Sequence, residues 1–293
     1  MNDEILKEIE KLEELEKYEE IINIIENLQV EQLNTEIIEE LARAYANIQK
    51  YEKAIEILKS IEYEGKNGVD WNYTIGYSYY YSKDYKNSEK YFLRALELNE
   101  TDNDIKNALL NVYLELSAQT INESIENKDK AIEYALKSEK YIITNDDKVK
   151  VNSHLAWIYE EIEDFDTAEK FLKNTIDLGR DDIPVNSELG HCLEQLTRFE
   201  EALEYYKKAM KLGRKDQWIY SRIGYICCCL KKYEESLEAN LKAYELGENN
   251  ILINSELGYS LGELQRFEEA ITYYLKAREL GREDRWIYFQ MGW

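Results

Sequence analysis

Apolar residues recur every three or four positions along almost the whole chain, which is the spacing of amphipathic helices. Between residues 2 and 29 they alternate with glutamate and lysine at this spacing. From residue 35 onward, short polar stretches divide the apolar pattern into segments of helix length, and proline occurs once in 293 residues. The pattern predicts an all-α chain built from pairs of helices joined by turns.

The repetition is clearest between residues 183 and 284. The sequence NSELG at 186–190 returns at 254–258, and RFEEA at 198–202 returns at 266–270. The offset is 68 residues, twice the 34-residue period of a helix-turn-helix repeat. We therefore expect stacked hairpins that share one continuous core.

Three places in the repeat carry small residues. With Ile183 as position 1, positions 8, 20 and 27 are Gly190, Ala202 and Ala209, and in the next two copies all of these places are glycine, alanine or serine. A large side chain there would force the helices apart, and overpacking of a core is costly. These positions are therefore predicted to be the closest contacts between helices.

Each regular hairpin ends in a glycine, and a potential capping residue follows three positions later. Glycine just past a helix end commonly adopts the left-handed conformation that stops the helix, and Asp or Asn caps the start of the next one. The predicted stops are Gly179, Gly213, Gly247 and Gly281, and the predicted caps are Asp182, Asp216, Asn250 and Asp284.

This pattern resembles the tetratricopeptide repeat (TPR) family. Its W-x2-L-G-x2-Y…A-x3-F…A signature is matched in part by Ile75-Gly76-x2-Tyr79…Phe92…Ala95 and by Leu155-Ala156-x2-Tyr159…Ala168. The family's proline near the end of the second helix is missing, and the tryptophans are displaced by one or two positions. The resemblance covers nearly the whole chain and implies an all-α, right-handed superhelical solenoid of antiparallel helix pairs. It identifies a scaffold, not an activity.

The expected organisation has four parts: a degenerate N-terminal capping hairpin at 1–34, TPR-like units at 35–148, regular TPR units at 149–284, and the first helix of a further, truncated unit at 285–293. The hairpin at 103–148 is expected to be irregular and extended. Its extra residues fall at 117–130, either as a functional insertion or as a tolerated, drifted hairpin tip. The apolar residues of 285–293 lack a following helix, so we expect them to favour end-to-end self-association.

Charge narrows the choice of partners. Lys and Arg number 37 and Asp and Glu 60, for a net charge of −23. Such a charge argues against nucleic acid, which requires a basic surface, and against anionic membranes. It favours basic or amphipathic protein partners over acidic ones.

Two further observations suggest a compartment. The sequence has no apolar run of bilayer length and no secretory signal. The four cysteines, Cys192, Cys227, Cys228 and Cys229, do not form a disulfide framework. A reducing cytoplasm is therefore the expected location.

The sequence offers no catalytic constellation. It contains no phosphate-binding glycine loop, no H-E-x-x-H and no nucleophile elbow, so we predict no catalytic residue, no cofactor and no enzymatic activity. His191 lies between Glu188 and Glu194 in an E-x-x-H turn of the kind found in di-iron bundles. That site needs a second copy, and the sister repeat has Tyr259 instead. A groove-lining histidine is therefore favoured over a metal ligand.

The resemblance also implies a concave groove lined by positions 2, 5, 6, 9, 12 and 13 of each first helix. Position 9 carries a ring in most repeats, and position 5 carries serine in several. The candidate groove residues are Tyr73, Tyr77, Tyr80, Trp157, Ser187, His191, Trp218, Arg222, Tyr225 and Tyr259. The rings are interpreted either as anchors for a bound peptide or as packing between helices in a chain with 25 tyrosines.

These observations favour an interaction scaffold that binds a peptide or protein segment in its groove. Members of the family that hold an acidic C-terminal tail use five lysine, asparagine and arginine positions, and only Arg222 matches here, so such a ligand is not expected. The alternative is a ligand- or peptide-sensing regulator similar to the bacterial receptors built on these repeats. Residues 1–29 are too short for the DNA-binding or phosphatase bundle that those receptors carry.

Overall fold

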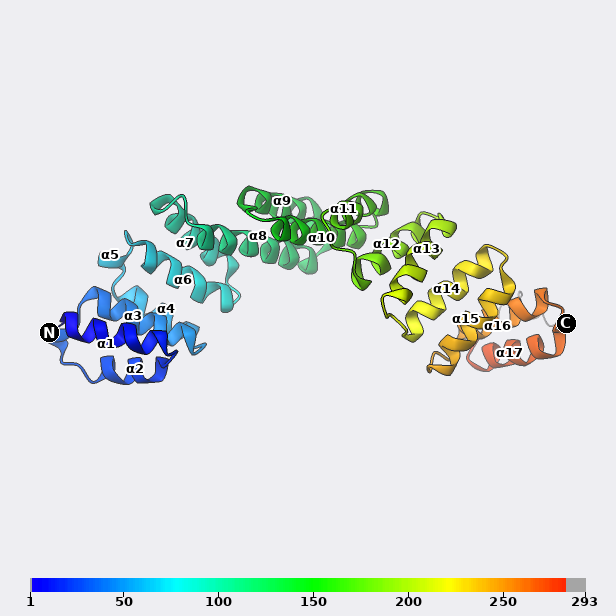
Figure 1. Cartoon of the computed structure of the whole chain (residues 1–293), viewed down its shortest axis with the longest axis horizontal. Helices are drawn as coiled ribbons and strands as arrows, with labels where there is room; N and C mark the ends of the chain where they lie inside the picture. Colours follow the sequence, from blue (N-terminus) through cyan, green and yellow to red (C-terminus); the bar gives the residue numbers. More distant parts are fainter. Residues whose placement is uncertain (1, 283–293) are drawn as a thin grey trace. The chain divides into compact units, whose positions relative to one another are not determined.

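The computed structural model describes residues 2–282, and this part of the chain consists of helices and connections without a β-strand (Figure 1). The chain divides into two compact units, Met1–Val151 and Asn152–Trp293, with the boundary inside α10 (Asn145–Glu161). In each unit, successive helices form antiparallel pairs that pack on the next pair. The predicted all-α, TPR-like fold is confirmed. The predicted helix at 285–293 and the cap at Asp284 lie outside the described residues.

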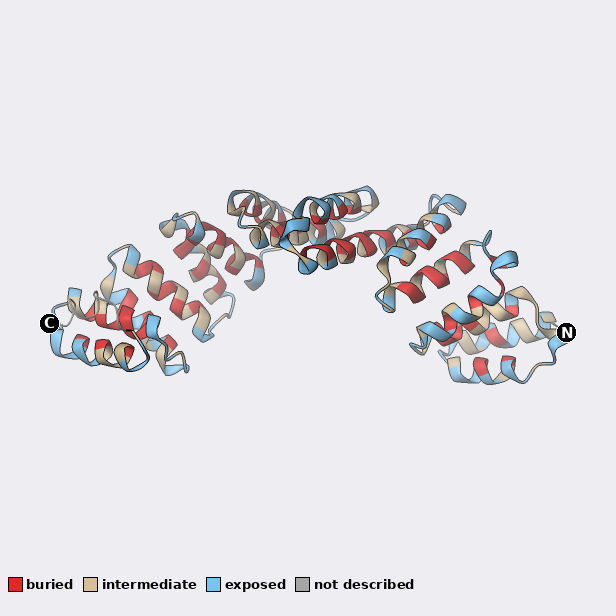
Figure 2. Cartoon of the chain, turned by 180° about the vertical axis from the view of Figure 1, so that it is seen from behind, coloured by how far each residue is buried: buried red, intermediate tan, exposed pale blue. Residues whose placement is uncertain are grey.

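The first unit contains α1 (Asn2–Glu14), α2 (Tyr18–Glu26), η1 (Val30–Gln32), α3 (Thr35–Asn47), α4 (Tyr51–Ser60), α5 (Glu62–Gly65), α6 (Val69–Tyr81), α7 (Tyr85–Leu98), α8 (Asn103–Glu123), η2 (Ile125–Asn127), α9 (Lys128–Ser138) and η3 (Glu139–Tyr141). The second unit contains α11 (Phe165–Asp177), α12 (Ile183–Gln195), α13 (Phe199–Lys211), α14 (Gln217–Cys229), α15 (Tyr233–Glu245), α16 (Ile251–Glu263) and α17 (Phe267–Glu279). Figure 2 shows the buried residues concentrated on the sides of the helices that face their neighbours.

Glycines and caps mark the helix ends as the sequence predicts. The four glycines have φ values of 100° at Gly179, 118° at Gly213, 105° at Gly247 and 106° at Gly281. The side chains of Asp182, Asp216 and Asn250 each accept a hydrogen bond from the backbone N–H three residues later. Such a cap contributes about 1 kcal/mol to helix stability.

Besides these glycines, the regular hairpins share a second kind of left-handed position, which no glycine marks. The turn between the paired helices has three residues in every regular hairpin, and the middle residue has φ near 60°. These residues are Gln49, Lys83, Glu163, Thr197, Lys231 and Gln265. Left-handed backbone is unfavourable for side chains with a Cβ. The tight connection between paired helices therefore imposes this conformation on whatever residue stands there.

The two helices of a hairpin approach closely through complementary side-chain sizes. A Cβ atom placed on Gly190 would lie 2.6 Å from the ring of Tyr206, and one on Gly258 would lie 2.5 Å from Tyr274. Glycine at position 8 thus makes room for an aromatic ring at position 24 in these two hairpins, and Gly224 makes room for Asn240 in the hairpin between them. Where position 8 is alanine, position 24 is leucine, and all four of these residues are fully buried: Ala42 with Leu58 and Ala156 with Leu172.

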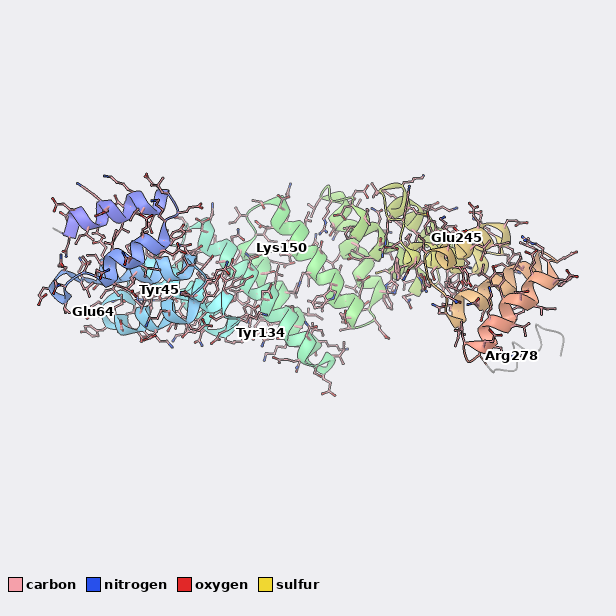
Figure 3. All side chains as sticks on the ribbon, turned by 90° about the horizontal axis from the view of Figure 1, so that it is seen from below. Tyr45, Glu64, Tyr134, Lys150, Glu245 and Arg278 are labelled. Atoms are coloured by element: carbon pink, nitrogen blue, oxygen red, sulfur yellow. The ribbon has the colours of Figure 1, made fainter. Side chains whose placement is uncertain are left out.

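The hairpin of α8 and α9 differs in length from its neighbours. Helix α8 has 21 residues, against 13 in α6 and in α12. Near its end, the Ser117 hydroxyl donates to the Ala131 carbonyl across the hairpin, with an O···O distance of 2.6 Å. On its other side α9 meets α7, where Lys86 Nζ lies 4.2 Å from the centroid of the Tyr134 ring (labelled in Figure 3). The longer hairpin is therefore packed up to Ser117 and Ala131, and residues 125–130 at its tip are exposed.

Helix α10 starts four residues before the predicted unit boundary at Val149. Thr144 and Asp147 cap each other reciprocally: the Asp147 carboxylate accepts from the Thr144 N–H at 2.8 Å, and the Thr144 hydroxyl accepts from the Asp147 N–H at 3.1 Å. This capping box supplies partners for backbone donors at the helix start. It accounts for the additional turn of α10.

Candidate functional site

In the second unit, Tyr225 of α14 and Tyr259 of α16 occupy equivalent positions on successive first helices. The Phe199 ring at the start of α13 packs edge-on against Tyr225 with centroids 6.4 Å apart, and Tyr233 at the start of α15 packs in the same way against Tyr259 at 6.0 Å. Edge-to-face aromatic pairs are favourable beyond their buried area. Each ring is therefore held by the second helix of the preceding hairpin.

The same pair recurs in other repeats. Phe165 packs edge-on against His191 at 5.8 Å, and Tyr51 packs against Tyr77 in the first unit at 6.5 Å. In each case the supporting ring is the first residue of a second helix and its partner lies 26 residues later. Packing between helices thus accounts for the contacts along one edge of each of these rings. All of the supported rings remain partly exposed on the other side.

Tyr225 and Tyr259 line one cavity of about 480 Å³. Its other lining residues combine apolar, hydroxyl, thiol and charged groups: Cys228, Cys229, Lys231, Tyr233, Leu252, Ser255, Glu256 and Arg282. We call this the α14–α16 groove. A surface that offers fixed aromatic rings beside hydrogen-bonding groups is suited to a peptide segment.

Glu256 forms a buried acidic wall of the α14–α16 groove. Its side chain is 7% exposed, and neither carboxylate oxygen has a hydrogen-bond partner among residues 2–282. Burial raises the pKa of Glu256 to about 7, and the nearby Asn240 amide and Arg222 guanidinium oppose that shift. A buried carboxylate with so little compensation is costly when it is ionised.

Replacing Glu256 with glutamine is expected to stabilise the fold at high pH. The raised pKa means that the folded state binds the proton more tightly than the unfolded state. The stabilisation that the folded state gains from binding this proton is fully present below pH 4.5 and is lost as the pH rises through about 7. We expect Glu256→Gln and wild type to unfold alike at pH 4 and to differ by about 1–2 kcal/mol at pH 8 in favour of the variant, within the limit of about 1.4 kcal/mol per pKa unit.

Urea titrations at several pH values measure this difference. Glu268→Gln, an exposed glutamate on α17, is the control for the loss of a negative charge. A Glu256→Gln variant that gains no stability between pH 5 and pH 8 relative to this control would contradict the assignment.

Two further groove candidates, Arg222 and Ser187, bond to other residues of the repeats. Arg222 Nη1 lies 3.1 Å from Glu194 Oε1, and the Tyr206 hydroxyl donates to the other oxygen of Glu194 at 2.7 Å. Ser187 is buried, and its hydroxyl donates to the Ile183 carbonyl one turn earlier. These side chains stabilise the repeat from within.

Trp218 and Trp157 lie at separate places in the second unit. Trp218 packs edge-on against Tyr206 at 5.7 Å, with the Arg214 guanidinium 4.1 Å from its ring centroid. Trp157 lies against His154 at 5.3 Å. Both tryptophans are partly exposed.

His191 lies in an acidic neighbourhood. Its Nδ1 is 3.8 Å from Glu160 Oε1, and the Cys192 thiol donates to that same oxygen at 3.1 Å. Burial raises the pKa of Glu188 to about 7, and the charge of Glu160 adds to the shift. Within the described range, no group of three or more His, Cys, Asp and Glu side chains is arranged to hold a metal ion.

In the first unit, Tyr73, Tyr77 and Tyr80 come together on α6. With Tyr81, Phe92 and four residues of α8 they line a second cavity of about 160 Å³, which we call the α6–α8 pocket. A neighbouring hollow between α3 and α6 is lined in part by Arg43, Tyr73 and Tyr77. The predicted tyrosine cluster therefore borders open space on both sides.

Sequence reasoning missed the supporting rings. The four supporting rings stand at position 17 of the repeat: Tyr51, Phe165, Phe199 and Tyr233. Two further hairpins carry Tyr85 and Phe267 at this position. Their 34-residue recurrence was a visible signal.

The fold and the grooves define a helix-pair repeat protein of the kind that serves as a scaffold for protein–protein interaction. Family models of the tetratricopeptide repeat match residues 69–102, 184–216 and 253–282. The chain therefore contains tetratricopeptide repeats at these three places, one in the first unit and two in the second. No match is found among curated proteins.

Solved structures show the same fold. The crystal structure of MamA protein is 19% identical and covers 59% of this chain and 92% of its own, with a TM-score of 0.52. MamA 41-end from Desulfovibrio magneticus RS-1 is 16% identical and covers 60% of this chain and 97% of its own, also with a TM-score of 0.52. Within residues 2–282, no helix combines the length and the apolar character needed to cross a membrane.

Proposed function

We propose that this protein is a non-catalytic scaffold that binds a basic or amphipathic protein segment in its groove. The observation that carries the proposal is the pair of fixed, partly exposed rings, Tyr225 and Tyr259, in one open cavity. Rings that are already held in place lose little conformational freedom on binding, so more of the contact energy appears as affinity. Aromatic side chains of this kind commonly dominate binding energy.

Charge supports a basic or amphipathic ligand. The chain carries −23 charges overall, and Glu256 lies in the wall of the α14–α16 groove. A positively charged segment would be attracted by this field, and the attraction would weaken with salt. Lys231 and Arg282 on the same lining provide places for acidic groups within an otherwise basic or amphipathic segment.

The decisive variant is Tyr225→Ala combined with Tyr259→Ala. Loss of two aromatic anchors is expected to weaken binding by at least about 30-fold, the equivalent of about 2 kcal/mol. Partners are captured from native lysate with the wild type, and the affinity of each captured protein is then measured with purified components. Circular dichroism confirms that the variant remains folded.

The control is Tyr205→Ala combined with Tyr273→Ala. These two tyrosines are also partly exposed and spaced by 68 residues, but they lie on the second helices α13 and α17. This variant should keep full affinity. Equal binding by the groove variant and the wild type would refute the proposal.

A further inference from the structure

The α6–α8 pocket has walls made mainly of aromatic rings. Residues 73, 77, 80 and 81 lie on one side of α6 because residues three, four, seven and eight apart share a helix face. Tyr77 and Tyr81 have centroids 4.6 Å apart, and Tyr73 packs edge-on against Phe92 at 5.4 Å. Tyr81 is also stacked on Tyr51 of α4 at 5.2 Å, although it remains 48% exposed. The rings thus support one another around the cavity.

The remaining wall comes from α8 and is acidic and polar. It consists of Asp104, Asn107, Ala108 and Asn111. None of the residues that line this pocket is a cation. Lys150 (labelled in Figure 3) donates to the Asn111 side-chain oxygen, so that lysine is already held by an amide at the edge of the pocket.

The electric field in the pocket favours positive charge. Burial raises the pKa of Tyr73, and Asp104 and Asp102 raise it further. Burial raises the pKa of Tyr80 to about 12, with Glu115 as the next cause. Burial opposes any charge in the pocket, whereas the negative charges of Asp104, Asp102 and Glu115 favour a cation over an anion. Neutral aromatic faces also attract cations through their quadrupole.

An anion is a poor occupant even though the pocket adjoins the start of α8. Helix N-termini attract anions through their free N–H groups. Here the Asp102 carboxylate already accepts from the N–H groups of Asp104 and Ile105, at 2.9 and 3.2 Å. The end of the helix is capped by the protein's own negative charge.

We propose that the α6–α8 pocket binds the cationic side chain of a protein segment, an arginine guanidinium or a lysine ammonium, between its tyrosine rings and Asp104. The pocket is large enough for the end of one side chain, at about 160 Å³. The proposal rests on the proposed binding function and adds to it a cation-recognition site in the first unit.

The test compares two small probes that differ in charge. N-acetyl-arginine methylamide carries the guanidinium, and N-acetyl-citrulline methylamide is its neutral isostere. Each is titrated into the full-length protein, and the tyrosine ring signals are followed by NMR. A cation over aromatic rings contributes about 1 kcal/mol at a partly exposed site, so the arginine probe should bind about fivefold more tightly than the citrulline probe. Equal binding of the two probes, or no binding of the arginine probe, would overturn the proposal.

Two pairs of variants locate the binding. Asp104→Asn should weaken the arginine probe severalfold, while Asp129→Asn, the second residue of α9 and exposed like Asp104, should leave it unchanged. Tyr81→Leu should weaken it, and Tyr81→Phe should retain it because the ring remains. Equal effects within either pair would place the probe elsewhere and refute the site.

The wild-type comparison needs no natural partner and concerns only the first unit. Its failure would remove the cation site and leave the α14–α16 groove untouched. Conversely, a groove variant that keeps its partners would refute the proposed function without altering the difference between the two probes. The two experiments therefore separate the two ideas.

Discussion

Replacing Gly190 with alanine is expected to lower the free energy of unfolding by about 2–3 kcal/mol, within the usual range for overpacked cores. The added Cβ would lie 2.6 Å from the Tyr206 ring. That ring cannot move away easily, because it is fully buried and its hydroxyl donates to Glu194 at 2.7 Å. Urea denaturation followed by circular dichroism measures the loss.

The control for this prediction is Gly262→Ala on α16. A Cβ there would meet only the Tyr274 hydroxyl oxygen, at 3.8 Å, so better helix propensity should give a gain of up to about 1 kcal/mol. Adding Tyr206→Leu to Gly190→Ala recreates the alanine–leucine pair of two other repeats. We expect it to recover part of the loss. If Gly190→Ala lowers the free energy of unfolding no more than Gly262→Ala does, the proposed size matching of Gly190 with Tyr206 is wrong.

Replacing Trp71 with alanine is expected to cost about 3–5 kcal/mol, the range for deleting a buried aromatic side chain. Trp71 on α6 is 1% exposed, and its Nε1 donates to the Leu58 carbonyl of α4 at 3.0 Å. Its ring also fills the space against Gly65, where a Cβ would lie 2.2 Å away. Deletion would leave a cavity where α4, α5 and α6 meet, and thermal unfolding of the full chain reports the effect.

Two companion variants interpret that result. Tyr63→Ala removes an 83% exposed aromatic residue of α5 and should change stability by less than about 0.5 kcal/mol. Trp71→Phe keeps an aromatic ring and removes the indole donor. It should fall between wild type and Trp71→Ala. A Trp71→Ala variant as stable as Tyr63→Ala would show that the tryptophan does not hold these helices together.

The fold was predictable because its determinants are local and repeated. The left-handed backbone of Gly213 is predictable from the residue type, since glycine adopts this conformation without penalty. Asp216, three residues later, is a standard capping residue. The second left-handed position could not be found in this way. Thr197 has φ of 58° although a β-branched residue is unfavourable there, because the closure of the hairpin imposes that backbone.

The candidate site was predictable only in part. The recurrence of rings at position 9 identified Tyr225 and Tyr259, and both line the same cavity. Their support by Phe199 and Tyr233 depends on packing between residues 26 positions apart, which no pattern within one helix reveals. Arg222 could equally have faced a ligand. Its pairing with Glu194 depends on the distance between α12 and α14.

The matching of glycine with tyrosine has a consequence for how the chain folds. Hairpins α12–α13 and α16–α17 close through the same contact, Gly190 with Tyr206 and Gly258 with Tyr274, and their flanking sequences are nearly alike. During folding, α17 therefore offers α12 almost the surface that α13 offers. The correct pairing is favoured mainly because α13 is closer to α12 along the chain than α17 is. This preference is weak, since each doubling of the connecting loop adds only about 0.6 kcal/mol to the cost of closing it. We therefore expect mispaired hairpins, within one molecule or between two, to be the kinetic traps of this duplicated sequence.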